Sequence, residues 1–122
     1  MVDRRPALIV DALGAIRAAM AFCASAWLAH YREDLLLRSA VERQLEILGE
    51  ACARLAREHP ALFEELPDAR SAVGPRNRIA HGCDHIDDQT IFETVTRNLP
   101  VLAAELQRWL RRLDPNAPEL LA

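Results

Sequence analysis

Lysine is absent from this sequence, so all fifteen basic residues are arginines. Any cationic surface must therefore consist of guanidinium groups, which bind carboxylates and phosphates through paired hydrogen bonds. Aromatic residues are scarce as well: three phenylalanines, two tryptophans and one tyrosine. The core must be built from leucine, alanine, isoleucine and valine. A core of small aliphatic side chains in 122 residues is marginal on its own, and burial in an oligomer would add to it.

Cysteine is rare, and long apolar runs are missing. Cys23, Cys52 and Cys83 are odd in number, widely separated and form no CxxC motif. This spacing argues against a disulfide framework or a zinc knuckle, and it predicts a cytoplasmic protein with free thiols. Asp3 and Asp11 interrupt the apolar N-terminal stretch. We therefore expect neither a signal peptide nor a membrane span.

The charge balance is mildly acidic, with a formal net charge of −3 at pH 7. This balance argues against a protein that coats nucleic acid without sequence preference, but it leaves room for a local basic site. Length and composition predict one soluble domain spanning residues 1–122.

Hydrophobic periodicity predicts an all-α protein. Long amphipathic helices are expected at about residues 4–28, 33–58 and 88–113, and a shorter helix at about 70–82, or from Pro75, ending at Gly82. Asp87 or Asp88 can cap the last helix, and Pro100 should kink it. The stretch EHPALFEELPDAR, residues 58–70, reads as a connector with room for one helical turn, and residues 114–122 read as a frayed tail. The result is an antiparallel helical bundle of three long helices plus one short motif-bearing helix. The expected core stripes are Leu8, Ala12, Ile16, Met20, Cys23 and Trp27; Leu37, Val41, Leu45, Leu48, Cys52 and Leu55; and Phe92, Val95, Leu99, Leu102, Leu106, Trp109 and Leu113.

Polar chemistry is concentrated in RNRIAHGCDHID, residues 76–87. Arg76 can hold a phosphate, and His81 can take and give a proton near neutral pH. Together they form a minimal set for metal-independent RNA cleavage, although such a pair also occurs as ordinary surface or cap residues. Asn77 and His81 share a helix face, whereas Arg76 points about 140° away from His81 on a straight helix. Arg76 joins them if His81 lies at the frayed helix end, or if a two-fold dimer combines residues of both chains.

Other polar residues give weaker signals. His85 follows His81 by four residues, but Gly82 intervenes and no third ligand is evident, so we predict no metal and no cofactor. His30 and His59 fall at helix ends, where solvation or capping is the default. The row Glu42–Glu46–Glu50 places like charges one turn apart. Either neighbouring arginines neutralise this row, or it meets arginines of another helix or subunit.

The stretch RNRIAHG followed by ID, after a helix reading VERQLEILGEACARL, resembles the HEPN superfamily, and more specifically HepT-like toxins of bacterial toxin–antitoxin pairs. The resemblance covers about residues 5–112. It rests on Arg76 followed directly by Asn77 and then by His81, and on the upstream Glu42 and Gly49-Glu50 pattern. It implies an all-α two-fold homodimer whose Arg and His line a cleft between the subunits, and a metal-independent endoribonuclease activity of a type VII-like system.

The same resemblance assigns roles and partners. His81 would be the acid–base group, Arg76 would bind the scissile phosphate and Asn77 would support it. The partners would be RNA and a minimal nucleotidyltransferase antitoxin. In these toxins a tyrosine two residues after the histidine accepts AMP, but this chain has Cys83 there. The toxin could then be silenced by simple binding of the antitoxin, or by modification of another residue. Silencing could also be unnecessary because the protein has lost its toxicity. The alternatives to an enzyme are a non-catalytic HEPN dimer that binds a nucleotidyltransferase or nucleotide, and a purely structural bundle.

Overall fold

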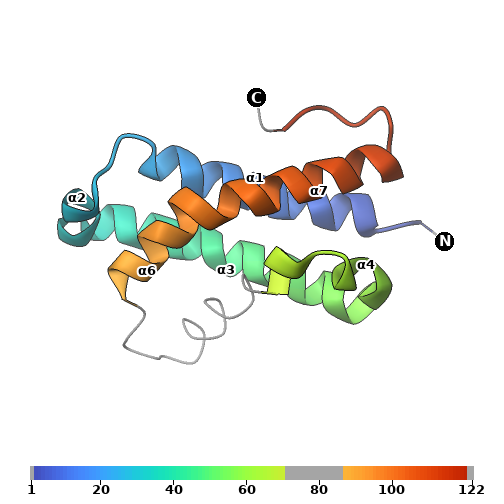
Figure 1. Cartoon of the computed structure of the whole chain (residues 1–122), viewed down its shortest axis with the longest axis horizontal. Coiled ribbons are helices and arrows are strands. Elements are labelled where there is room, and N and C mark those ends of the chain that lie inside the picture. The colour runs from blue at the N-terminus through green and yellow to red at the C-terminus, as the bar shows by residue number, and fades with distance from the viewer. Residues whose placement is uncertain (1, 71–86, 121–122) are drawn as a thin grey trace.

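The computed structural model describes residues 2–70 and 87–120, and every regular element in these ranges is a helix (Figure 1). The prediction of an all-α fold is thus confirmed for this part of the chain. Residues 67–70 are also helical. The elements are α1 (Arg5–Cys23), α2 (Leu28–Glu33), α3 (Leu35–Glu58), α4 (Pro60–Glu64), α6 (Asp88–Glu93), the π-helix η1 (Thr94–Asn98) and α7 (Leu99–Leu113).

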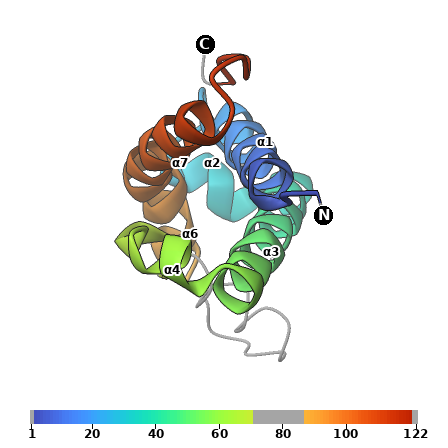
Figure 2. The ribbon, with the colours of Figure 1, turned by 90° about the vertical axis from the view of Figure 1, so that its right-hand side faces the viewer.

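The helices form a bundle around one core. Viewed from one end, α1, α3, α4 and α7 surround a shared interior (Figure 2). Helix α1 runs in one direction, and both α3 and the α6–η1–α7 segment return in the opposite direction (Figure 1). Helix α1 packs along both α3 and α7, so it connects the two other long helices of the bundle.

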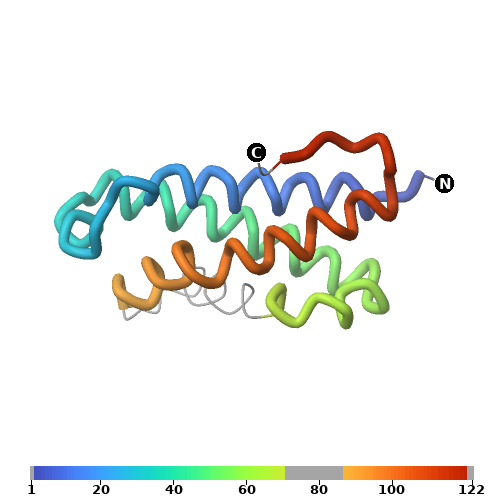
Figure 3. Tube along the Cα trace, turned by 45° about the horizontal axis from the view of Figure 1, so that its top comes forward, coloured from blue at the N-terminus to red at the C-terminus, as the bar shows by residue number. Residues whose placement is uncertain are grey.

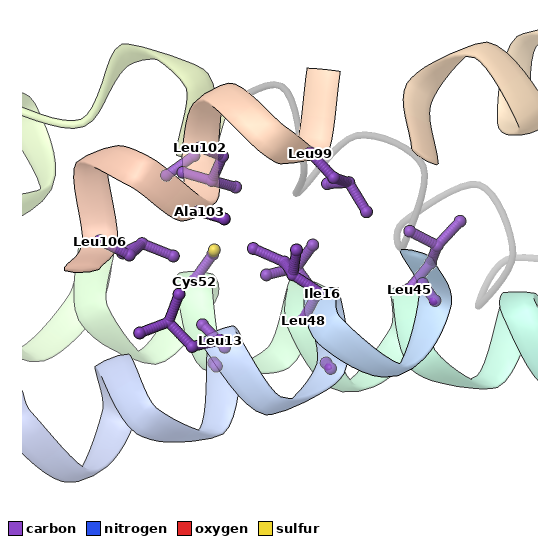
Figure 4. Close-up of a cluster of buried hydrophobic side chains, with 14 of the residues drawn as sticks. Leu13, Ile16, Leu45, Leu48, Cys52, Leu99, Leu102, Ala103 and Leu106 are labelled. Carbon is purple, nitrogen blue, oxygen red and sulfur yellow. The ribbon is translucent and has the colours of Figure 1, made fainter. Parts of the chain in front are cut away.

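The core is aliphatic, as the scarcity of aromatic residues requires. Leu13 and Ile16 of α1 face Leu48 and Cys52 of α3, and Leu102 of α7 closes the cluster from the other side (Figure 4). All five are at most 1% exposed. Burying a large aliphatic side chain contributes about 1.5–3 kcal/mol, so these helices are held together mainly by such contacts. Most residues of the three predicted stripes lie in this core or pack against it.

The expected helix over residues 4–28 is wrong at its C-terminal end. Helix α1 stops at Cys23, residues 24–25 form a turn, and α2 begins at Leu28. Trp27 has extended backbone angles (φ −101°, ψ 162°) and is 74% exposed, so it lies outside the core stripe to which it was assigned. No glycine or proline marks this break in the sequence, which is why periodicity alone extended the helix. Residues 29–32, which the expected helix bounds left as a break between two helices, lie inside the helix α2.

Pro100, which was expected to kink the last helix, stands in the first turn of α7, directly after a change of winding. The π-helix Thr94–Asn98 lies directly before it, and the amide of Leu99 donates to the carbonyl of Thr94, five residues back. A proline inside an α-helix lacks a donor and clashes with the carbonyl four residues earlier. A π turn is a known way to widen the helix locally. The hydroxyls of Thr94 and Thr96 donate to backbone carbonyls at 2.8 and 2.9 Å within this region.

The C-terminal tail folds back over the bundle (Figure 3). The side chain of Gln107, only 3% exposed, donates to the carbonyl of Pro118 at 3.3 Å and accepts from the amide of Leu120 at 3.1 Å. Ala117 and Leu120 pack against the core. Residues 114–120, where the sequence predicts fraying, are therefore attached to α7 by hydrogen bonds and apolar contacts.

Within the described ranges, α1 alone is long and apolar enough to cross a membrane by length and composition. The core helix of a soluble protein passes the same test, and α1 buries Leu8, Ile9, Leu13 and Ile16 in this bundle. Yet only 44% of its most apolar window is buried. One side of an apolar helix thus remains uncovered.

Candidate active site

The predicted site residues fall in one segment of the chain. Arg76, Asn77, His81 and Cys83, together with His85, belong to residues 71–86 and lie outside the described residues. The expected helix over 70–82 lies outside them too, except for Arg70. The structure does place the two ends between which this segment runs. These are the helical residues 67–70, which follow α4, and Asp87, which precedes α6.

At the second of these ends, the chain enters α6 through a capped and acidic turn. The carboxylate of Asp87 accepts a hydrogen bond from the amide of Gln89 at 3.2 Å, so the predicted cap is confirmed. Asp88 occupies the first turn of α6, where a negative charge is favourable to the helix dipole. The described chain therefore resumes after residue 86 in a capped, acidic helix start.

Glu42 of α3 lies close enough to this turn for the charge of Asp88 to shift the pKa of its carboxyl. Partial burial raises the pKa of the Glu42 carboxyl, and the negative charge of Asp88 raises it further. Arg38 acts in the opposite direction. A carboxyl with a raised pKa next to a capped helix start is a group that can exchange a proton under milder conditions than a solvated glutamate.

Tyr31 completes this cluster from α2. Its side chain is fully buried, and its ring lies 5.6 Å from that of Phe92, centroid to centroid. Its hydroxyl has no hydrogen-bond partner among the described residues. Burial raises the pKa of this phenol, and the negative charge of Glu42 raises it further. Tyr31, Glu42 and Asp88 therefore form one cluster, which we call the α2–α3–α6 cluster.

The burial of Tyr31 bears on how the protein could be modified. A phenol accepts a nucleotidyl group only if its oxygen can reach the phosphorus of the donor nucleotide. The Tyr31 side chain is 0% exposed and its phenol is held neutral, so it cannot act as an acceptor while the bundle is folded. The chain has no other tyrosine.

A second acidic pair lies near the other end of the segment. Asp68 belongs to the helical residues 67–70, and Glu105 belongs to α7. Burial raises the pKa of the Glu105 carboxyl, and the neighbouring charge of Asp68 raises it further, whereas Arg108 lowers it. Acidic groups thus stand near both ends of a segment whose own sequence contains Arg76, Arg78, His81 and His85.

The described cysteines and histidines offer little further chemistry. Cys23 and Cys52 are buried free thiols; burial raises the pKa of both, that of Cys52 to about 12, so neither is a ready nucleophile. His59 is the C-cap residue of α3, as its position at a helix end predicted, and His30 is exposed in α2. Within residues 2–70 and 87–120, no three His, Cys, Asp or Glu side chains are grouped so that they could hold a metal ion.

The acidic row of α3 is at least partly neutralised within the chain. A guanidinium nitrogen of Arg43 lies 3.3 Å from the carboxylate of Glu46, and Arg38 acts on Glu42. This favours the first of the two explanations offered for the row. The α2–α3–α6 cluster itself was missed by sequence reasoning, because its members come from three helices and no spacing connects them. Glu42 alone carried a signal, through its position in a row of like charges and its place in the family pattern.

The described part of the chain is a helical bundle, and the polar motif lies in the one segment before the last helix. This arrangement places the protein in the class of small helical domains. Comparison with known proteins narrows that class. The family described as Ribonuclease HepT-like matches residues 12–109, and the chain belongs to this family. A protein of Caldanaerobacter subterraneus subsp. tengcongensis, named "Putative RNase TTE0752", is 28% identical over 80 residues, which cover 66% of this chain and 70% of that protein. No solved structure matches significantly.

Proposed function

We propose that this protein is a metal-independent endoribonuclease and the toxin of a type VII-like toxin–antitoxin pair. Membership of the HepT-like ribonuclease family, together with the sequence Arg76-Asn77 and His81 inside the matched range, carries this proposal. Ribonuclease is also the activity in the name of the Caldanaerobacter relative.

The residues of the motif supply the groups that this chemistry needs. His81 would take the proton from the 2′-hydroxyl, and the oxygen would attack the adjacent phosphorus. Arg76 would stabilise the charge that builds up on the non-bridging oxygens, and Asn77 would support it. The 5′-oxygen then leaves with a proton. The products are a 2′,3′-cyclic phosphate and a 5′-hydroxyl end, and no metal ion is required for this step.

A two-fold homodimer with the motif in a cleft between subunits is part of the proposal. On one straight helix Arg76 and His81 point apart, and residues from two chains resolve that conflict. The other proposed partner is a minimal nucleotidyltransferase antitoxin, and the proposed location is the cytoplasm, where the free thiols Cys23 and Cys52 stay reduced.

The test is cleavage of a labelled RNA by the purified protein in EDTA. We expect cleavage by the parent and a loss of about 100-fold or more for Arg76→Ala and His81→Ala. Arg78→Ala is the matched control, because it removes the same charge from the same segment outside the motif. Full activity of His81→Ala would end its assignment as the proton carrier.

A second candidate function is favoured by Cys83. The family's AMP-accepting tyrosine is replaced, and Tyr31 is too buried to substitute for it. The chain could then be a non-catalytic dimer that binds a nucleotidyltransferase or nucleotide. Absence of cleavage by parent and variants alike, with stable binding of the nucleotidyltransferase, would support this candidate over the enzyme.

A further inference from the structure

A groove of about 390 Å³ lies where the end of α1 meets η1 and the start of α7. Met20 and Ala24 belong to one wall, and Phe92, Thr96 and Pro100 belong to the other. None of the described residues that line it is charged. A mainly apolar groove of this size can hold a flat organic ring. We call it the α1–η1 groove.

Exposed apolar side chains continue this lining onto the surface. Trp27 directly follows the lining residue Ala26 and is 74% exposed. Val101 directly follows Pro100 and is 53% exposed. A tryptophan ring with most of its surface free offers a face on which another flat ring can stack. The groove and its border therefore suit a ligand with flat, apolar parts.

Arginines stand on both sides of the groove. Arg17 precedes Met20 by three residues, so the two are neighbours on the surface of α1, and Arg97 directly follows Thr96 on the opposite wall. Both arginines are exposed, and neither forms an ion pair with another described residue. Glu93, four residues before Arg97, accepts a hydrogen bond from a side-chain amide of its own helix at 3.0 Å. The groove thus combines apolar walls with two guanidinium groups that a ligand can bind.

The groove between α1 and α3 has the opposite character. Its volume is about 260 Å³, and its lining includes the carboxylates of Asp11, Glu46 and Glu50 beside the guanidinium groups of Arg43 and Arg54. Carboxylates in a groove repel a polyanion, and the lining of the α1–η1 groove contains none. Of these two grooves in the described part of the chain, the α1–η1 groove is the one that fits a ligand with both apolar rings and negative charges.

We propose that the α1–η1 groove binds single-stranded RNA, with unpaired bases in the groove and stacked on Trp27, and with their phosphates on Arg17 and Arg97. Unpaired bases have apolar faces that stack on aromatic side chains, and phosphates accept paired hydrogen bonds from guanidinium groups. Asp87, which directly follows the segment containing the proposed motif, precedes Thr96 by nine residues, about 14 Å along a helix. A strand of several nucleotides can span such a distance.

This second RNA contact rests on the proposed function, because that function supplies RNA as the ligand. Binding and cleavage are measured separately, so the two proposals can fail separately. A parent protein that binds RNA through the groove but does not cut it would contradict the ribonuclease and support the groove. A parent that cuts RNA, with groove variants that bind RNA as tightly as it does, would overturn the groove.

The first test measures how a fluorescently labelled single-stranded RNA binds the full chain carrying His81→Ala, in EDTA and over a range of salt concentrations. Adding Arg17→Gln/Arg97→Gln should weaken binding by on the order of tenfold and reduce the slope of log K against log salt by about 0.7 for each arginine. Arg43→Gln/Arg54→Gln removes the same charge from the groove between α1 and α3, and this matched control should leave the slope unchanged. An unchanged slope in the first pair, or equal losses in both pairs, would overturn the proposal.

The second test examines base stacking on Trp27 with the same RNA. Trp27→Phe keeps an aromatic face and should retain most of the affinity, whereas Trp27→Leu should weaken binding by about tenfold. Because this side chain is 74% exposed, neither substitution disturbs the core. A duplex of the same sequence should bind more weakly than the single strand, since its bases are already paired and stacked.

Two outcomes of the second test would contradict the proposal. One is equal affinity of Trp27→Leu and the parent for the single strand, and the other is equal affinity of the parent for single strand and duplex. Unchanged RNA binding in every groove variant, together with loss of binding to the nucleotidyltransferase, would assign the groove to that protein and overturn the proposal as well.

Discussion

Tyr31 shows what a single residue contributes to this fold. Its ring fills the space where α2 meets α6, against Phe92, and its hydroxyl is buried without a partner among the described residues. A buried hydroxyl without a hydrogen bond costs free energy, whereas the ring stabilises the fold through apolar contact. The hydroxyl of Tyr31 thus lowers the stability of the fold, and the ring raises it.

The effects of the Tyr31 hydroxyl and of its ring on stability can be measured separately with two substitutions. Tyr31→Phe removes the hydroxyl only, and we expect the free energy of unfolding to stay within about 1 kcal/mol of the parent or to rise. Tyr31→Ala removes the ring and should cost about 3–5 kcal/mol. Urea denaturation of both variants tests this. A loss of several kcal/mol in Tyr31→Phe would mean that the hydroxyl has a partner that stabilises it.

Glu42 predicts a pH dependence of stability. Its pKa is raised in the folded protein, mainly by burial, so the folded state binds this proton more tightly than the unfolded state. The favourable contribution is complete below the unfolded pKa of about 4.3 and is lost as pH rises through the raised folded pKa. The Glu42→Gln side chain cannot ionise. Its melting temperature should therefore rise relative to that of the parent as the pH increases across this interval. A difference that is constant with pH would contradict the assignment.

At the scale of the element, one helix start was predicted from its capping side chain, since α6 begins after Asp87. The cap of α3 was not predicted: this helix begins after Asp34, whose carboxylate accepts from the amide of Leu37 at 3.0 Å, whereas periodicity placed its start at about residue 33. The end of α1 was missed, because Ala24 to Trp27 contain no residue that disfavours a helix. The π turn before Pro100 was missed as well. A proline in the sequence indicates that the helix is disturbed there, but it does not indicate whether the helix kinks or forms a π turn.

The cap of α3 can be tested directly. Asp34→Ala leaves the amide of Leu37 without this acceptor and should cost about 1 kcal/mol. Asp34→Asn keeps an oxygen acceptor and should retain most of the stability, which makes it the matched control. Thermal unfolding followed by circular dichroism distinguishes the two. Equal melting temperatures for Asp34→Ala and the parent would show that the cap contributes nothing.

At the scale of the whole molecule, the amphipathic stripes sufficed to predict an all-α bundle with an aliphatic core. Leu13, Leu48 and Leu102 come from three helices and meet in that core. The candidate site was predictable only as a motif. Arg76 and His81 are neighbours in sequence, and their spacing alone does not say which other groups face them. The α2–α3–α6 cluster depends on three helices packing together, so only the folded structure reveals it.

The most direct test of the ribonuclease account uses two end-labelled oligonucleotides in EDTA, one all-RNA and one with a single 2′-deoxynucleotide at the mapped cut. We expect the parent to cut the first, leaving a 2′,3′-cyclic phosphate, and to spare that position in the second, while His81→Ala cuts neither. Cleavage of the deoxy-substituted position, or an intact RNA after prolonged incubation with the parent, would contradict it.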